Sequence, residues 1–270
     1  MSNAMIDFGY VRPRSVAEAA KLLADEPEAK VLAGGQSLIP ILKQRLARPS
    51  LLVDVQALDA MRGIEIDDSH VRLGAFTRHA EVAANARIAE ALPALAHMAR
   101  GIAHPQVRHM GTIGGSLAHN DPGADYPAAV LGLGATIVTD RRRIAADEFF
   151  TGLFDTALAA GELLLQIEFP RHRRSGYCKI PHPASGLVNT GVWITRLGDG
   201  VRVAVNGASP CVFRHGELEQ RLAAHFDPAS LDDFHQPAQG LNADMHTSAE
   251  YRAQLVAVAA RRALSMALSH

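Results

Sequence analysis

Hydrophobic and polar positions near the start of the chain alternate between helical and strand-like patterns. Ser15 and Glu18 form an S-x-x-E capping box, and the apolar positions after it recur at helical spacing. Residues 30–33 and 51–55 are short apolar runs that predict strands, and residues 37–47 repeat the helical pattern between them. The order of strand, glycine pair, helix and strand indicates a small α/β unit.

The middle of the chain mixes the two patterns. Residues 63–74 alternate apolar and polar positions on both sides of an Asp-Asp-Ser turn, which predicts a hairpin. Helical patterns follow at residues 78–84 and 93–100. Strands or strand–helix mixtures are predicted at residues 135–139, 144–150 and 162–170. The three arginines from Arg141 to Arg143 fit a solvated hairpin turn.

A polar break near residue 172 separates this region from a C-terminal part, and we expect a domain boundary there. Residues 186–209 predict two strands joined at Gly198-Asp199-Gly200. Helices are predicted near residues 214–224, 228–234 and 248–268, the last with a capping box of Thr247 and Glu250. Helices and strands mixed in this way predict the α+β fold class.

Composition excludes several classes of function. Lys+Arg 27 against Asp+Glu 28 gives a net charge of -1, so no positive field would attract nucleic acid or an anionic membrane surface. Arginines interrupt the long final helix, so no membrane span is expected. The two cysteines, Cys178 and Cys211, lack CxxC spacing and cannot supply an iron–sulfur or zinc site. Free thiols suit a reducing compartment, and we expect a cytoplasmic protein.

Two glycine pairs are the main candidates for binding chemistry. The segments AGGQS, Ala33 to Ser37, and TIGGS, Thr112 to Ser116, each place a glycine pair before a helical run. Backbone amides in such bends can donate hydrogen bonds to phosphate, although a tight turn alone also explains one pair. Two such loops indicate a diphosphate, hence a dinucleotide. The chain lacks GxGxxG and GxxxxGK[ST] motifs, which disfavours a Rossmann domain and a P-loop.

Longer segments around these loops carry a family resemblance. They are FGYVRPRSVAEAAKLL, LAGGQSLIPILKQRLARP, HPQVRHMGTIGGSLAHNDPGADYPAA and SAEYRAQLVAVAARRAL, and they span nearly the whole chain. In these segments the chain resembles the FAD-binding medium subunit of the molybdenum hydroxylases, the family of aerobic carbon monoxide dehydrogenase and xanthine dehydrogenase. The resemblance implies two FAD-binding subdomains of the PCMH/vanillyl-alcohol-oxidase type, residues 5–60 and 61–172, and a C-terminal α+β domain, residues 173–270.

The resemblance also implies FAD as cofactor and a set of contacts to it. The implied pyrophosphate-binding residues are Ala33, Gly34, Gly35, Gln36, Ser37 and Leu38 on one side, and Thr112, Ile113, Gly114, Gly115 and Ser116 on the other. Asp125 would bind ribose hydroxyls or cap the following helix, and Lys179 would lie close to the flavin or be an ordinary surface lysine. Ile102 and Leu164 are implied apolar contacts or ordinary core residues. Gln36 and Ser116 replace the histidine and asparagine often found in the family.

The implied function is electron transfer without a catalytic side chain in this chain. An iron–sulfur small subunit would supply electrons from a molybdopterin-containing large subunit, in a dimer of heterotrimers, and FAD would pass them to an external acceptor. A stand-alone FAD-dependent oxidoreductase and an assembly module without FAD are the alternatives. A serine hydrolase built on Ser116, His119 and Asp121 is disfavoured because Ala118 breaks the GxSxG motif. His104, His109 and His119 lack a carboxylate partner and are not expected to bind metal.

Overall fold

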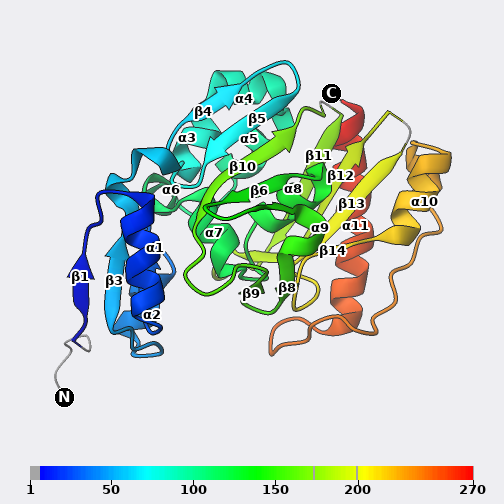
Figure 1. Ribbon diagram of the computed structural model, residues 1–270. Helices are drawn as coiled ribbons and strands as arrows, with labels where there is room; N and C mark the ends of the chain where they lie inside the picture. Colours follow the sequence, from blue (N-terminus) through cyan, green and yellow to red (C-terminus); the bar gives the residue numbers. More distant parts are fainter. Residues whose placement is uncertain (1–6, 173, 199, 270) are drawn as a thin grey trace.

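The computed structural model describes residues 7–172, 174–198 and 200–269, and it consists of three parts arranged in chain order (Figure 1). A small parallel sheet forms one end, a five-stranded antiparallel sheet with helices forms the middle, and a four-stranded antiparallel sheet forms the other end. The predicted mixture of helices and strands is confirmed. The expected domain start at residue 5 and the turn residue Asp199 lie outside the described residues.

The N-terminal sheet has the strand order β1-β3-β2, with all pairs parallel. Its strands are β1 (Gly9–Val11), β2 (Lys30–Leu32) and β3 (Leu51–Asp54), and its helices are α1 (Val16–Asp25) and α2 (Leu38–Lys43). Ser15 Oγ accepts from the Glu18 amide at 3.1 Å, so the predicted cap of α1 is confirmed. The loop between β2 and α2 contains the first glycine pair, and it faces the middle part of the molecule.

The middle sheet has the order β4-β5-β10-β6-β7, with every pair antiparallel. Its strands are β4 (Ile64–Ile66), β5 (His70–Gly74), β6 (Thr136–Thr139), β7 (Arg143–Ala145) and β10 (Leu164–Pro170). Its helices are α3 (His79–Ala84), α4 (Ala86–Ala91), α5 (Pro93–Arg100), α6 (Pro105–Met110), α7 (Ile113–His119), α8 (Tyr126–Leu133) and α9 (Ala146–Phe149). A small hairpin of β8 (Phe150–Gly152) and β9 (Asp155–Thr156) lies beside them.

The predicted hairpins of this part are confirmed. Strands β4 and β5 pair across the Asp-Asp-Ser turn, and β6 and β7 pair across the arginine-rich turn. Arg142 Nε donates to Glu162 Oε1 at 3.0 Å, and this guanidinium lowers the pKa of Glu162 to about 2. The arginines of this turn therefore have a structural role.

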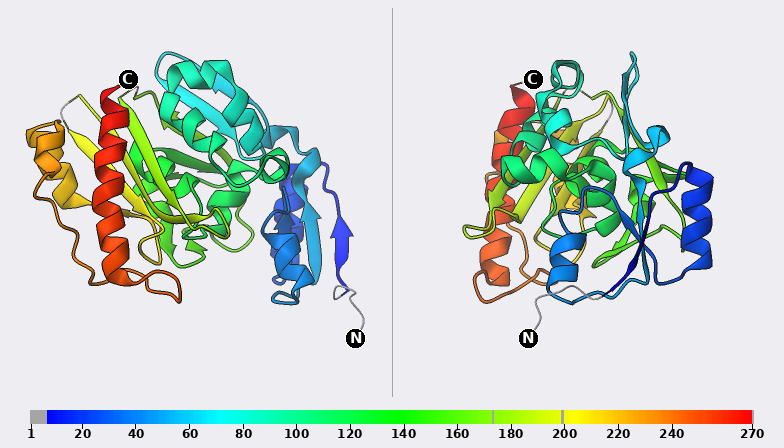
Figure 2. Two further views of the ribbon diagram at one scale, coloured as in Figure 1. Left: turned by 180° about the vertical axis from the view of Figure 1, so that it is seen from behind. Right: turned by 90° about the vertical axis from the view of Figure 1, so that its left-hand side faces the viewer.

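The C-terminal sheet has the order β11-β12-β13-β14. Its elements are β11 (Ser175–Pro181), β12 (Val188–Arg196), β13 (Val201–Asn206), β14 (Phe213–Arg214), α10 (Gly216–Ala224), a 3-10 turn (Pro228–Leu231) and α11 (Ala249–Leu268). Helix α11 covers one face of β11 and β12 (Figure 2). The predicted capping box of α11 is wrong by one residue, because Ser248 Oγ accepts from the Tyr251 amide. Thr247 Oγ1 instead accepts from Asn189 Nδ2.

Helix α8 joins the middle and C-terminal parts through a shared core. All of its residues are buried, and it packs on β12 and β13. Gly132 permits this close approach, because a Cβ atom there would overlap the indole ring of Trp193. The apolar core of the middle part therefore continues into the C-terminal sheet through Tyr177 and Trp193. None of the helices in the described ranges combines the length and the hydropathy needed to cross a membrane.

Candidate functional site

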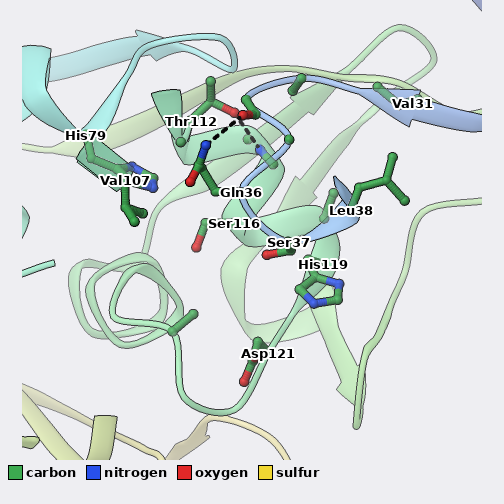
Figure 3. A pocket seen from close by; sticks show the side chains of 18 of the residues that line it. Val31, Gln36, Ser37, Leu38, His79, Val107, Thr112, Ser116, His119 and Asp121 are labelled. Carbon is green, nitrogen blue, oxygen red and sulfur yellow. Dashed lines mark hydrogen bonds between the residues drawn. The ribbon is translucent and has the colours of Figure 1, made fainter. Parts of the chain in front are cut away.

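A cleft of about 760 Å³ lies between the N-terminal and middle parts, with the β11–β12 loop at one end. Most of the implied cofactor contacts line it: Ala33, Gly34, Gly35, Gln36, Ser37, Leu38, Ile102, Thr112, Gly114, Gly115, Ser116, Asp125 and Leu164. Figure 3 shows Gln36, Ser37, Thr112 and Ser116 near the centre of this cleft. Segments far apart in the chain thus converge on one cavity. Its size lies within the range of about 300–1,000 Å³ that is typical of ligand pockets.

The two glycine loops touch each other. A Cβ atom at Gly34 would overlap the Met110 carbonyl oxygen and lie 2.8 Å from Gly111 Cα. Across the same contact, a Cβ atom at Gly115 would lie 3.8 Å from Ala33 Cβ. The packing of the chain against itself therefore requires glycine at residue 34, which sequence reasoning had attributed to the approach of a ligand.

The first loop leaves its backbone donors free. Among the described residues, none accepts a hydrogen bond from the amides of residues 34–38. Gly35 has a φ of 70°, a left-handed conformation that glycine adopts without strain. Gln36 Nε2 donates to the Gly34 carbonyl at 3.4 Å within the same loop. Unpaired amides that face a cavity are donors for an anionic ligand.

The second loop uses its amides inside the protein. The amides of Ile113 and Gly114 donate to the carbonyl groups of Thr77 and Ala75 at 3.0 and 2.9 Å. The Gly115 amide donates to Thr112 Oγ1 at 3.2 Å. These bonds fix α7 to the segment after β5, so the interpretation of this loop as a second amide donor array needs correction. The side chains of this loop, rather than its amides, are left to contact a ligand.

Hydroxyl groups are the polar atoms that the second loop presents to the cleft. Thr112 Oγ1 accepts from Gly115, and its own proton stays free to donate. Ser116 Oγ has no hydrogen-bond partner among the described residues, and Figure 3 shows it pointing into the cleft. The cleft therefore presents free amides on one side and hydroxyls on the other.

Two implied residues do not line the cleft. Ile113 is fully buried in the apolar core. Lys179 lies behind the wall, where Nζ donates to the Gly101 carbonyl at 2.8 Å and to Asp125 Oδ2 at 3.2 Å. Its side chain is 12% exposed, so it is not a surface lysine.

Asp125 joins the cleft wall to the C-terminal sheet. Its carboxylate does not cap α8, because it accepts from Lys179 and from the Tyr177 hydroxyl instead. Burial raises the pKa of Asp125 to about 6, although the Lys179 ammonium opposes this shift. Among the described residues, Asp125 is thus one of two buried carboxylates that line the cleft, and the other is Glu162, which pairs with Arg142.

Sequence reasoning missed several residues of the cleft. His79, Val107, Phe154 and Leu187 all line it. Burial, followed by the charge of Arg108, lowers the pKa of His79 to about 4, so its ring is neutral. The sequence alone did not indicate that these residues line the cleft, because they come from four separate segments and none lies in a glycine-rich motif.

The arrangement excludes two kinds of chemistry proposed by the motifs. Asp121 Oδ1 accepts from the Gly123 amide, and the His119 ring packs on Phe154 at 5.1 Å between centroids, so Ser116, His119 and Asp121 form no relay in the described residues. The same described ranges contain no group of His, Cys, Asp or Glu side chains that could hold a metal ion.

Free loop amides, hydroxyls and apolar walls in one cleft suit an anionic ligand with apolar parts, such as a dinucleotide. Residues 6–172 match the family model of the FAD binding domain in molybdopterin dehydrogenase. The chain therefore belongs to the family of FAD-binding subunits of molybdenum hydroxylases. It is an oxidoreductase flavoprotein, and its cofactor is FAD.

Similar proteins cover nearly the whole chain. The nicotine 6-hydroxylase medium subunit of Paenarthrobacter nicotinovorans is 35% identical over 94% of this chain and 95% of its own length. The carbon monoxide dehydrogenase medium chain of Hydrogenophaga pseudoflava is 32% identical over 96% of both. A solved structure of carbon monoxide dehydrogenase from that organism matches with a TM-score of 0.88 at 31% identity, covering 98% of this chain and 99% of the other.

Proposed function

We propose that FAD binds in the cleft with its pyrophosphate between the two glycine loops. The amides of residues 34–38 would donate to the phosphate oxygens from one side, and the hydroxyls of Thr112 and Ser116 from the other. The single observation that carries this proposal is the run of unpaired amides facing the cleft beside an unpaired hydroxyl. Anionic oxygens would satisfy donors that the protein itself leaves unpaired.

The remaining implied residues divide into contacts and supports. Ile102 and Leu164 would contact the ring systems of FAD, because both lie at the cleft wall. Asp125 would hydrogen-bond to the ligand from the same wall. We assign Lys179 a positioning role, because it holds Asp125 and the Gly101 carbonyl and does not reach the cavity. The three ranges 5–60, 61–172 and 173–270 are proposed as the corresponding domains.

The chain acts as the electron-transfer subunit of a molybdenum hydroxylase. FAD supplies the redox chemistry when bound, and the protein binds it, orients it and excludes water from it. An iron–sulfur subunit and a molybdopterin-containing subunit are its partners, and an external acceptor receives the electrons. We propose a dimer of heterotrimers as the assembly and a reducing cytoplasm as the compartment, since Cys178 and Cys211 are free thiols.

The substrate of the whole enzyme is set outside this chain. Relatives of 35% and 32% identity are named for nicotine and for carbon monoxide, so similarity in this subunit does not separate such substrates. The alternative of a stand-alone flavoenzyme is not favoured, because full-length relatives are named as subunits of larger enzymes.

Titration of the flavin-free chain with FAD tests the proposed site. We expect saturable quenching of flavin fluorescence with one FAD per chain, and protection of Gly35 and Gln36 in a footprinting or cross-linking experiment. A chain that shows no saturable binding, or that binds FAD with residues 34–38 unaffected, would refute the proposal.

A further inference from the structure

The bend between α5 and α6 forms part of the cleft wall. Ile102, Ala103 and His104 all line the cleft, together with Val107 from the first turn of α6. Pro105 begins α6 and restricts the residue before it to an extended conformation, which His104 adopts with a φ of -98° and a ψ of 161°. The chain therefore turns at the two preceding residues, Ile102 and Ala103.

The backbone of this bend is strained at Ala103. Its φ of 40° lies in the left-handed region, which a Cβ atom disfavours and which glycine usually occupies after a helix. The methyl group of Ala103 is small and only partly buried, so it gives little packing energy in return. A strained conformation persists only where neighbouring groups hold the backbone. The hydrogen-bond partners of the bend therefore show what holds it.

Three successive carbonyl groups of the bend accept hydrogen bonds from cationic side chains. Arg108 Nη1 donates to the carbonyl oxygens of Ile102 and Ala103 at 2.7 and 2.9 Å. Lys179 Nζ donates to the carbonyl oxygen of Gly101 at 2.8 Å. Hydrogen bonds from a charged donor are stronger than those between neutral groups. Side chains from α6 and β11 thus hold the bend through its carbonyl groups.

These hydrogen bonds also set the direction of two backbone amides. The described residues contain no cis peptide bond, and in a trans peptide the N–H points opposite to the C=O of the same unit. The carbonyls of Ile102 and Ala103 are turned toward Arg108, which does not line the cleft. The amides of Ala103 and His104 are therefore directed away from Arg108. Among the described residues, no group accepts a hydrogen bond from either amide.

We propose that Arg108 is a positioning residue, which holds the bend at residues 101–104 in its strained shape and so prepares its two free amides to bind FAD. This inference rests on the proposed location of FAD in the cleft. Arg108 does not line the cleft, so it acts through the backbone of the bend. A wall that is already ordered lowers the conformational cost of binding, because the ligand does not have to fix it.

Arg108→Gln and Arg261→Gln are the matched variants that test this role. Arg261, on α11, also donates from one nitrogen to two successive carbonyl oxygens, those of Leu231 and Asp232, and it does not line the cleft. In flavin fluorescence titrations, Arg108→Gln is expected to weaken FAD binding about tenfold, because two charge-assisted hydrogen bonds to the bend are lost. Arg261→Gln should leave FAD affinity unchanged. Melting temperatures of the flavin-free chains show whether each variant folds.

Ala103→Gly in the Arg108→Gln chain separates positioning from charge. Glycine adopts the left-handed conformation without strain, so the bend can keep its shape without the arginine. The double variant is expected to recover most of the lost FAD affinity, although it does not recover the positive charge. The proposal is overturned if the double variant binds FAD as weakly as Arg108→Gln, or if Arg108→Gln binds FAD as tightly as the wild type.

Hydrogen exchange of the wild-type chain tests the bend even if Arg108→Gln does not fold. The amides of Ala103 and His104 should exchange rapidly without FAD and slowly with it, because the ligand supplies their acceptors. If FAD protects residues 34–38 but leaves these two amides unaffected, the role of the bend is refuted and the proposed FAD site stands. A wild-type chain that binds no FAD, or binds it with both segments unaffected, refutes the site itself.

Discussion

The loops at residues 33–38 and 112–116 have similar sequences but use their backbones differently. The first leaves the amides of residues 34–38 free toward the cleft. The second directs the amides of Ile113 and Gly114 into hydrogen bonds with Thr77 and Ala75. A glycine pair before a helix is thus no proof of a backbone phosphate site, because the same pair also allows two segments of chain to pack closely.

Because the two loops use their amides differently, one loop mainly stabilises the fold and the other mainly binds the ligand. The second loop holds α7 against the middle sheet and provides a fixed wall with two hydroxyls. The first loop provides donors at the cost of leaving backbone groups unpaired until a ligand arrives. Substitutions in the two loops should therefore have different consequences, and four of them test the comparison in order of decreasing effect.

Gly34→Ala should have the largest effect, because Gly34 is where the loops touch. The new methyl group would overlap backbone atoms of Met110, which cannot rotate away as a side chain could. We expect a loss of about 3 kcal/mol in the free energy of unfolding and loss of measurable FAD binding. Urea unfolding and FAD titration measure the two quantities.

Gly216→Ala is the matched control for Gly34→Ala. Gly216 begins α10, and a Cβ atom there would meet nothing within 4 Å. Its replacement should leave FAD binding unchanged. Normal stability and FAD affinity in Gly34→Ala would show that the loops do not pack as described.

Gly114→Ala should mainly destabilise the protein. A Cβ atom at Gly114 would lie 2.6 Å from Ala75 Cβ and 2.8 Å from the Ala75 carbonyl oxygen. We expect a loss of about 2 kcal/mol in unfolding free energy, with FAD affinity of the folded chain changed less than by Gly35→Ala. A stable Gly114→Ala chain that no longer binds FAD would instead give this loop a direct donor role.

Gly35→Ala should mainly weaken binding. Its φ of 70° disfavours alanine by about 1 kcal/mol, and the nearest obstacle is the flexible Ile39 side chain at 3.0 Å. Relaxation of this bend would redirect the neighbouring free amides, and we expect FAD affinity to fall about tenfold. If calorimetry finds the affinity unchanged, the amides of the first loop do not bind the ligand.

Ser116→Ala should have the smallest effect. The hydroxyl has no partner among the described residues, so its removal should leave the melting temperature unchanged. Loss of one of several hydrogen bonds to the phosphates should lower FAD affinity by about 0.5 to 1 kcal/mol, which is less than the tenfold loss expected for Gly35→Ala. A change in melting temperature without a change in affinity would make Ser116 a structural residue.

The sequence was informative where a pattern is local. The capped helix α1, the hairpin of β4 and β5, and α5 at Pro93–Arg100 all match their predictions. Strand β1 and helices α4 and α6 were missed, because short elements give little periodic signal. Strand β11 was also missed, because its sequence SGYCKIP does not alternate between apolar and polar residues.

The sequence predicted most of the residues that line the site, but not what each of them does there. Both glycine loops could be named from sequence. Which amides stay free depends on the segment after β5, where Ala75 and Thr77 accept from α7. Likewise, Phe154 carries no motif, and only the structure shows that it lines the cleft in contact with the His119 ring.

Hydrogen exchange of the flavin-free chain, with and without FAD, tests the difference between the loops most directly. The amides of residues 34–38 should exchange rapidly without FAD and become protected when FAD binds, because the ligand supplies their acceptors. The amides of Ile113 and Gly114 should be protected already and change little. Fast exchange at Ile113 and Gly114 that only FAD slows, with residues 34–38 unaffected, would contradict the account.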